Sequence, residues 1–166
     1  MAENCVLKGD KMNNQRHFTV SIFIVCKDKI LLHLHKKYGI LLPLGGHLDN
    51  NELPEEACIR EAREEAGLEI DLYNADLGSP FTNDNEESNI KFIVRPMHMI
   101  YGQADSDHYH IDFNYYATTH SYQVNPLEGE SNLIYWYTKE ELSQINNIPR
   151  NVMAMANEAL DLLSRK

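Results

Sequence analysis

Glu61, Glu64 and Glu65 are spaced so that a helix would place three carboxylates side by side. Residues three and four positions apart lie on the same side of an α-helix. Carboxylates this close repel one another, so a structure that holds them together needs compensating positive charge. Hard divalent cations such as Mg²⁺ prefer an oxygen cluster of this kind. The spacing therefore predicts a metal site, with Arg60 and Arg63 as the alternative source of positive charge.

The helix that carries these glutamates has a beginning and an end that can be read from the sequence. Pro54 suits the first turn, because its fixed φ matches a helix and its missing N–H is not needed there. Gly67 predicts the end, since glycine takes the positive φ of a C′ position without a steric clash. The side opposite the glutamates is small and apolar, with Cys58, Ala62 and Ala66. We therefore expect about three turns packed closely against a sheet.

A glycine pair precedes this helix, and residues 45–68 read GGHLDNNELPEEACIREAREEAGL. Gly46, Glu52 and residues 60–68 resemble the Nudix box, GX5EX7REUXEEXGU, in which U is a bulky aliphatic residue. Every fixed position matches. Ala62 departs from the pattern, because it is smaller than the usual aliphatic residue there. A merely solvated acidic helix face would not explain the glycines and the arginine.

The resemblance implies an α/β fold, specifically an α/β/α sandwich around a mixed β-sheet. It also implies hydrolysis of a pyrophosphate bond in a nucleoside diphosphate linked to another moiety X. The implied cofactor is Mg²⁺, with Mn²⁺ as a substitute. Two alternatives stay open: a nucleotide-sensing module without turnover, and an enzyme like isopentenyl diphosphate isomerase, which needs a cysteine in its pocket.

The metal ligands expected from this box are Glu61 and Glu65, with Glu64 completing the cluster. The carbonyl of Gly45 is expected to assist, because glycine lets the backbone approach an ion closely. The metal site would then consist of oxygen atoms alone, which suits Mg²⁺.

Catalysis also needs a base to take a proton from the attacking water. Glu64 is the first candidate, and Glu128 or Glu130, in a loop before a later strand, is the alternative as base or further ligand. An exposed turn with no role in the site is the other interpretation of Glu128 and Glu130, and the composition of the loop slightly favours it. The resemblance suggests that Glu52 and Arg60 form an ion pair that positions the loop. The expected catalytic residues are Glu64, Glu61 and Arg60.

Polar and apolar residues alternate along a predicted strand at 109–119. The polar face there would carry His108, His110, Asp112 and Asn114. A polar face in a sheet covered by helices can line a pocket, so we expect His110 and Asp112 to contact the substrate. The alternative is a plain solvated sheet face. His47, in the turn before the helix, either approaches a substrate phosphate or faces water.

Further strands are predicted by runs of β-branched and aromatic residues at 17–26, 29–35, 40–44, 68–73, 90–101 and 133–137. His33 and His35 would share one strand face, where solvent exposure or hydrogen bonding is a better interpretation than a zinc pair. Residues 74–90 have the composition of a mobile acidic loop. Thr138 and Glu141 form a capping box for a short helix, and apolar spacing predicts a final helix over 152–163.

The whole composition limits the class of protein. The 166 residues suit one domain, 1–166, with 1–16 as a peripheral N-terminal segment. A net charge of −10 disfavours nucleic acid and anionic membranes, so the expected partner is a small nucleotide or another diphosphate. Three scattered cysteines form neither a disulfide framework nor a metal motif. With no apolar run long enough for a bilayer or a signal peptide, we expect a cytoplasmic protein, and a homodimer stays open.

Overall fold

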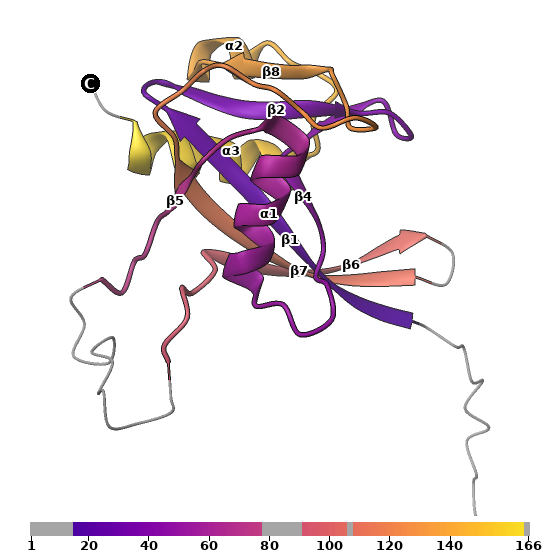
Figure 1. Ribbon diagram of the computed structural model, residues 1–166. Coiled ribbons are helices and arrows are strands. Elements are labelled where there is room, and N and C mark those ends of the chain that lie inside the picture. Colours follow the sequence, from indigo (N-terminus) through magenta and orange to yellow (C-terminus); the bar gives the residue numbers. More distant parts are fainter. Residues whose placement is uncertain (1–14, 78–90, 106–107, 165–166) are drawn as a thin grey trace, which may run out of the picture.

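The computed structural model describes residues 15–77, 91–105 and 108–164, and Figure 1 shows their arrangement. Eight strands form one sheet with the order β3-β2-β1-β7-β5, in which β4 also pairs with β1, β6 with β7, and β8 with β2. The strands are β1 (Gln15–Cys26), β2 (Lys29–His35), β3 (Ile40–Leu42), β4 (Leu44–His47), β5 (Asp71–Leu72), β6 (His98–Asp105), β7 (His108–Thr118) and β8 (Ile134–Tyr137).

The centre of the sheet is the parallel pair β1 and β7, which runs from Gln15↔His108 to Val25↔Thr118. All other strand pairs are antiparallel, so the sheet is mixed. Because β7 occupies one edge of β1 along this length, β4 and β2 share the other edge. β4 pairs with residues 19–22 and β2 with residues 25–26. The two strands therefore separate beside the middle of β1.

Helices cover both faces of this sheet (Figure 1). Val20, Ile22 and Ile24 of β1 face the core under α1 (Pro54–Ala66). Phe23 and Val25 face the core under α3 (Arg150–Leu163). Successive residues of a strand point to opposite faces, which explains why β1 is apolar almost throughout. The expected α/β/α sandwich is confirmed.

The helix α1 has the ends predicted from the sequence. It begins at Pro54, and Gly67 terminates it in the left-handed region with φ of 64°. A Cβ at Gly67 would lie 2.5 Å from the carbonyl oxygen of Asn125, so any side chain would also collide with the backbone there. Cys58, Ala62 and Ala66 are fully buried against the sheet, which confirms the small apolar face.

Three strand predictions differ from the structure. The run 40–44 forms two strands, because Pro43 interrupts it and lacks the N–H of a ladder. Residues 68–73 pair only at Asp71–Leu72, since Leu68 is buried beside α1 instead. The strand predicted at 90–101 begins only at His98, after Pro96, and extends to Asp105.

The remaining helices follow their sequence signals. α2 (Lys139–Ser143) begins at the predicted capping box, in which the Glu141 N–H donates to the Thr138 hydroxyl at 3.2 Å. α3 buries its apolar face in the second core. Most of the expected acidic loop, residues 78–90, lies outside the described residues, as do residues 1–14 of the expected peripheral segment. Within the described chain, no helix combines the length and apolarity needed to cross a membrane.

Candidate functional site

The carboxylates of α1 meet the glycine pair of β4. The side chains of Glu61 and Glu65 are each 12% exposed, whereas that of Glu64 is 42% exposed. The Gly45 N–H donates to Oε2 of Glu65 at 2.7 Å. A Cβ at Gly46 would lie 2.3 Å from Oε1 of Glu61, so a side chain at this position would displace that carboxylate. The glycine pair is therefore fitted to the buried glutamates.

These glutamates lie in an environment that penalises their negative charge. Burial, together with the charges of Glu61, Glu130 and Glu64, raises the pKa of Glu65 to about 8. Burial also raises the pKa of Glu61, although the Arg60 guanidinium opposes that change. Two buried carboxylates with raised pKa values and a third beside them are an oxygen donor set that a divalent cation would stabilise. Glu61, Glu64 and Glu65 therefore offer the type of donor atom that hard divalent cations prefer.

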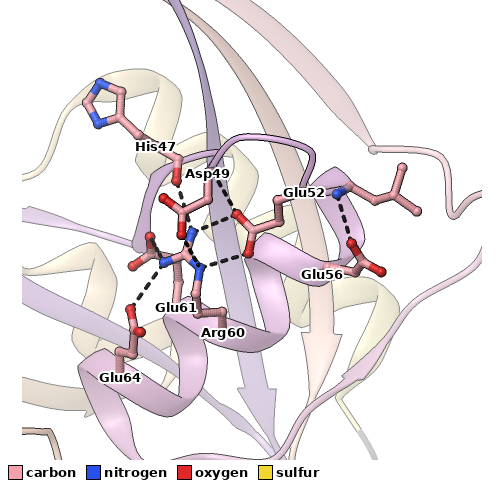
Figure 2. A network of polar contacts seen from close by, with 8 residues as sticks. His47, Asp49, Glu52, Glu56, Arg60, Glu61 and Glu64 are labelled. Carbon is pink, nitrogen blue, oxygen red and sulfur yellow. Dashed lines mark hydrogen bonds and ion pairs between the residues drawn. The ribbon is translucent and has the colours of Figure 1, made fainter.

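Arg60 links the helix to the turn that precedes it (Figure 2). Its Nε and Nη2 atoms donate to the two carboxylate oxygens of Glu52 at 2.8 and 2.9 Å, as the resemblance implied. Nη2 also donates to the carbonyl oxygen of His47 at 3.0 Å. Nη1 donates to Glu61 at 2.7 Å and to Glu64 at 3.1 Å. Arg60 thus both positions the loop and neutralises part of the cluster.

Arg63, the other cation considered as a source of compensating charge, takes no part in this network. Its guanidinium binds Glu69 on the exposed side of the helix, with Nε and Nη2 contacts of 2.9 and 2.7 Å. Arg60 is therefore the arginine that neutralises the cluster.

A pocket of about 840 Å³ opens beside Gly45, Gly46 and Glu65. This volume is within the range of small-molecule sites. The pocket lies over the α3 side of the sheet and includes residues from β1, β2, β3, β4, β6, β7 and α3. Glu65, on the α1 side, lines this pocket because β2 and β4 separate from each other next to β1.

Asp112 stands in the pocket wall within a hydrogen-bonded group. Its carboxylate accepts hydrogen bonds from the hydroxyls of Thr19 at 2.8 Å and Ser21 at 2.9 Å, and from Nδ2 of Asn114 at 3.0 Å. Asn114 and Thr19 are almost completely buried. Three donors hold this carboxylate in one orientation toward the pocket.

His47 and His110 line the same pocket. The ring of His47 points away from the Arg60 network, while its carbonyl oxygen belongs to that network (Figure 2). Burial lowers the pKa of both His47 and His110, and neighbouring imidazoles lower it further. Both rings are therefore neutral at pH 7. Their neighbours His17 and His108 were not singled out as site residues from the sequence, although His108 belongs to the predicted polar strand face.

His33 is a further pocket residue that the sequence did not identify as functional. It is 8% exposed, and its Nδ1 lies 3.9 Å from Oε1 of Glu65. Burial lowers its pKa to about 4, and His35 contributes to that shift. The expectation of an exposed or hydrogen-bonded strand histidine is wrong for His33. The spacing of His33 and Leu31 could have indicated this burial. Residues two apart in a strand share a face, and Leu31 packs in the core under α1.

The two candidate carboxylates outside the box occupy different places. Glu130 lines the pocket, and its charge raises the pKa of both Glu61 and Glu65. Glu128 is exposed and does not line the pocket. Glu64 lines a second, smaller depression with Arg60 and Arg63 rather than the main pocket.

Cys58 bears on the isomerase alternative. Its thiol is fully buried between α1 and the sheet and does not line the pocket. Burial raises the pKa of this thiol far above its ordinary value, and nearby carboxylates add to the rise. The other cysteine in the described part of the chain, Cys26, is also buried and outside the pocket. Neither can act as the acid or base that isomerase chemistry needs.

The family model and the similar solved structures point to the same protein family. A model of the NUDIX domain matches residues 15–157. The crystal structure of a NUDIX-family hydrolase from Clostridium perfringens is 56% identical, with a TM-score of 0.83, over 90% of this chain and 99% of that chain. A search of curated proteins gives no match.

Two more distant structures are similar in fold. The NUDIX domain of Shewanella oneidensis NrtR, complexed with ADP ribose, is 14% identical with a TM-score of 0.63, over 95% of each chain. The C. elegans Ap4A hydrolase is 15% identical with a TM-score of 0.56, over 89% of this chain and 94% of that chain. Together with the box geometry, the domain match and the 56% identity show that this chain belongs to the Nudix hydrolase family, whose members cleave nucleoside diphosphates linked to another moiety.

Proposed function

We propose that this protein is a Mg²⁺-dependent pyrophosphohydrolase that acts on a small nucleotide, a nucleoside diphosphate linked to X. The observation that carries the proposal is the buried pair Glu61 and Glu65, which lies against Gly45 and Gly46, with Glu65 reaching the pocket. Ionised carboxylates that are buried close together destabilise the folded protein unless a cation neutralises them. The pocket volume also suits a ligand of nucleotide size.

The metal would be held by Glu61, Glu64 and Glu65, with the carbonyl of Gly45 as a further donor. When bound, Mg²⁺ neutralises the pyrophosphate oxygens and acidifies water, and Mn²⁺ can supply the same chemistry. Arg60 holds Glu61 and Glu64 in place from the side of the turn. Gly45 donates its N–H to Glu65 and so orients that carboxylate.

The general base is either Glu64 or Glu130. Glu64 is fixed by Arg60 and is the more exposed member of the box cluster. Glu130 lines the pocket itself, so its position supports it as the base that takes the water proton. Glu128, exposed and outside the pocket, has no comparable support.

The substrate would contact the wall formed by His47, His110 and Asp112. The two neutral imidazoles can each donate one N–H to a phosphate or sugar oxygen. Asp112 accepts hydrogen bonds from Thr19 and Ser21 and can still accept from a ribose or base donor. The NrtR domain complexed with ADP ribose shares this fold, which supports including that ligand in a substrate screen.

The decisive experiment is a screen of nucleoside triphosphates, nucleotide sugars, dinucleoside polyphosphates, ADP-ribose and coenzymes with Mg²⁺ or Mn²⁺. Phosphate released after coupled phosphatase treatment is measured. Glu65→Gln should lower kcat by at least about 100-fold on the best substrate, since it removes a metal ligand. Glu130→Gln should lower kcat more than Glu64→Gln does, if Glu130 is the base. The exposed Glu128→Gln is the matched control and should leave kcat unchanged.

Two results would contradict the proposal. Full Mg²⁺-dependent activity of Glu65→Gln would exclude Glu65 as a metal ligand. A nucleotide that raises the melting temperature but releases no product with either metal would indicate a sensing module instead.

We also infer a homodimer and a cytoplasmic location. Phe18, Met99 and Tyr101 are each more than half exposed, which supports an apolar contact surface. The free thiols of Cys26 and Cys58 fit a reducing compartment.

A further inference from the structure

Four histidines belong to the strands that meet where β1 begins, and Figure 1 shows this end of β1. His17 lies near the start of β1, His108 and His110 open β7, and His47 ends β4. β1 pairs with β7 at His17↔His110 and with β4 at Thr19↔His47. These registers place the four imidazoles on three adjacent strands and on the same face of the sheet.

The rings converge in a way that suits a metal ion. One nitrogen from each of His17, His47 and His108 lies within 4.8 Å of the others. The ring centres are 5.3 Å apart for His17 and His47, 4.1 Å for His17 and His108, and 5.7 Å for His47 and His108. Two imidazoles bonded to one tetrahedral Zn²⁺ have centres about 5 Å apart, given a Zn–N bond of about 2 Å.

His110 extends the cluster toward the pocket. Its Nε2 lies 2.9 Å from Nε2 of His108, and its ring centre is 4.9 Å from that of His47. All these ring pairs are edge-on, with interplanar angles of 61–87°. Within the described residues, none of the four rings forms a hydrogen bond or ion pair with a carboxylate.

The donor set differs in kind from that of the Nudix box. Imidazole nitrogens suit borderline transition metals such as Zn²⁺ and Ni²⁺, whereas Mg²⁺ prefers oxygen. A sheet also holds such ligands on rigid elements, because the strand register fixes which residues are neighbours. The histidines would therefore bind a different class of metal ion from the one that Glu61 and Glu65 suit.

We propose that His17, His47 and His108, with His110 completing the set, bind one transition-metal cation of the Zn²⁺ class at the end of the pocket. The inference goes beyond the proposed function, because it does not depend on which substrate is hydrolysed or on the Mg²⁺ site. Since His47 and His110 also line the pocket, the ion would add positive charge to the wall that faces an anionic substrate.

The test uses the full-length chain without a polyhistidine tag, freed of metal by dialysis. Zn²⁺ affinity is measured by competition with a chromophoric chelator, and Co²⁺ binding by its visible absorption spectrum. We expect one Zn²⁺ per chain in the wild type, and a tetrahedral Co²⁺ spectrum. His17→Gln and His108→Gln, neither of which lines the pocket, should each weaken Zn²⁺ binding by at least about tenfold.

Two control variants locate the bound ion. His120→Gln removes an exposed histidine outside the cluster and should leave Zn²⁺ affinity unchanged. Glu65→Gln disables the carboxylate site and should also retain Zn²⁺ binding, even though it loses hydrolysis. Circular dichroism melts of the metal-free variants show whether each is folded. His17→Gln and His108→Gln change different strands, so they test the site independently.

Three results would overturn the proposal. The first is the absence of Zn²⁺ binding by folded wild-type protein. The second is unchanged affinity in both His17→Gln and His108→Gln. The third is loss of Zn²⁺ binding in Glu65→Gln alone, which would assign the ion to the carboxylates. Failure of the hydrolase screen would leave these measurements unaffected.

Discussion

Glu65 shows how the burial of a single carboxylate affects stability. It is a buried carboxylate whose pKa is raised to about 8 by burial and by neighbouring glutamates, and its one described hydrogen-bond donor is the N–H of Gly45. In the metal-free protein the folded state therefore favours its protonated form near neutral pH. A divalent cation reverses that preference, because it stabilises the ionised carboxylate.

The first residue-scale prediction concerns Glu65→Gln in metal-free protein. A folded-state pKa of about 8 lies above the ordinary value of 4.5, so folding favours the proton. The resulting stability is fully present below pH 4.5 and is lost as pH rises through about 8. Glutamine cannot ionise and does not lose it. At pH 8.5 the variant should melt roughly 5 °C above wild type, the shift that about 2 kcal/mol produces in a domain of this size.

Thermal unfolding in EDTA at pH 4.5 and pH 8.5 checks this prediction. The two proteins should have nearly the same melting temperature at the lower pH. Glu128→Gln, at an exposed position outside the pocket, should follow wild type at both. A variant less stable than wild type at pH 8.5 would show that Glu65 is ionised and stabilising without metal.

At the scale of elements, the site depends on how closely α1 approaches the sheet. Cys58, Ala62 and Ala66 have no exposed surface, and they contact a core that includes Leu31 and Tyr115. The small residue at position 62 is the departure from the Nudix box. Because Ala62 is fully buried and protein interiors are close-packed, we expect little room for a larger side chain at this position.

Restoring the bulky residue of the box should therefore destabilise this protein. Ala62→Leu inserts three carbon atoms into a filled core and should lower the free energy of unfolding by about 1–3 kcal/mol. Urea denaturation measures the change. Ala154→Leu, an exposed alanine on α3, is the matched control and should change stability by less than about 0.5 kcal/mol. Equal stability of Ala62→Leu and wild type would show that the core has room for the larger side chain.

At the scale of the whole molecule, the strands β1, β6 and β7 extend beyond the helices as a projecting arm (Figure 1). One face of the arm carries the four histidines. The other face is apolar, with Phe18 stacked on Phe113 and Tyr101 stacked on Tyr109. Met99 lies on this second face, because it pairs with Phe113. Phe18, Met99 and Tyr101 on this face are each more than half exposed, which supports its use between two copies of the chain.

The oligomeric state tests this inference. Wild-type protein should sediment with the mass of two chains at micromolar concentration. Phe18→Ser combined with Met99→Ser should give the mass of one chain, since it removes two exposed apolar side chains from the contact. Leu77→Ser is the matched control, because Leu77 is 83% exposed but lies outside the arm. A wild-type monomer at every concentration would contradict the homodimer.

The sequence by itself determined the helix that carries the box glutamates, because its signals are local. Pro54 and Gly67 define a helix through their own backbone preferences, and the spacing of Glu61, Glu64 and Glu65 places them on one side of it. The pairing of Glu52 with Arg60 also followed from the motif. Strand boundaries were less certain, since Pro43 and Pro96 interrupt apolar runs that otherwise favour β structure.

Only the tertiary structure decided which distant residues share the site. His33 lies 3.9 Å from Glu65 because it shares the α1 side of the sheet with Leu31, and Glu130 lines the pocket from a loop far along the chain. The histidine cluster depends on the register of β1 with β7 and β4, which joins residues up to 93 positions apart. Periodicity along one strand shows which face a residue occupies, but it carries no information about the neighbouring strand. Long-range pairing therefore decided the pocket walls, whereas the local sequence had already determined the carboxylates they surround.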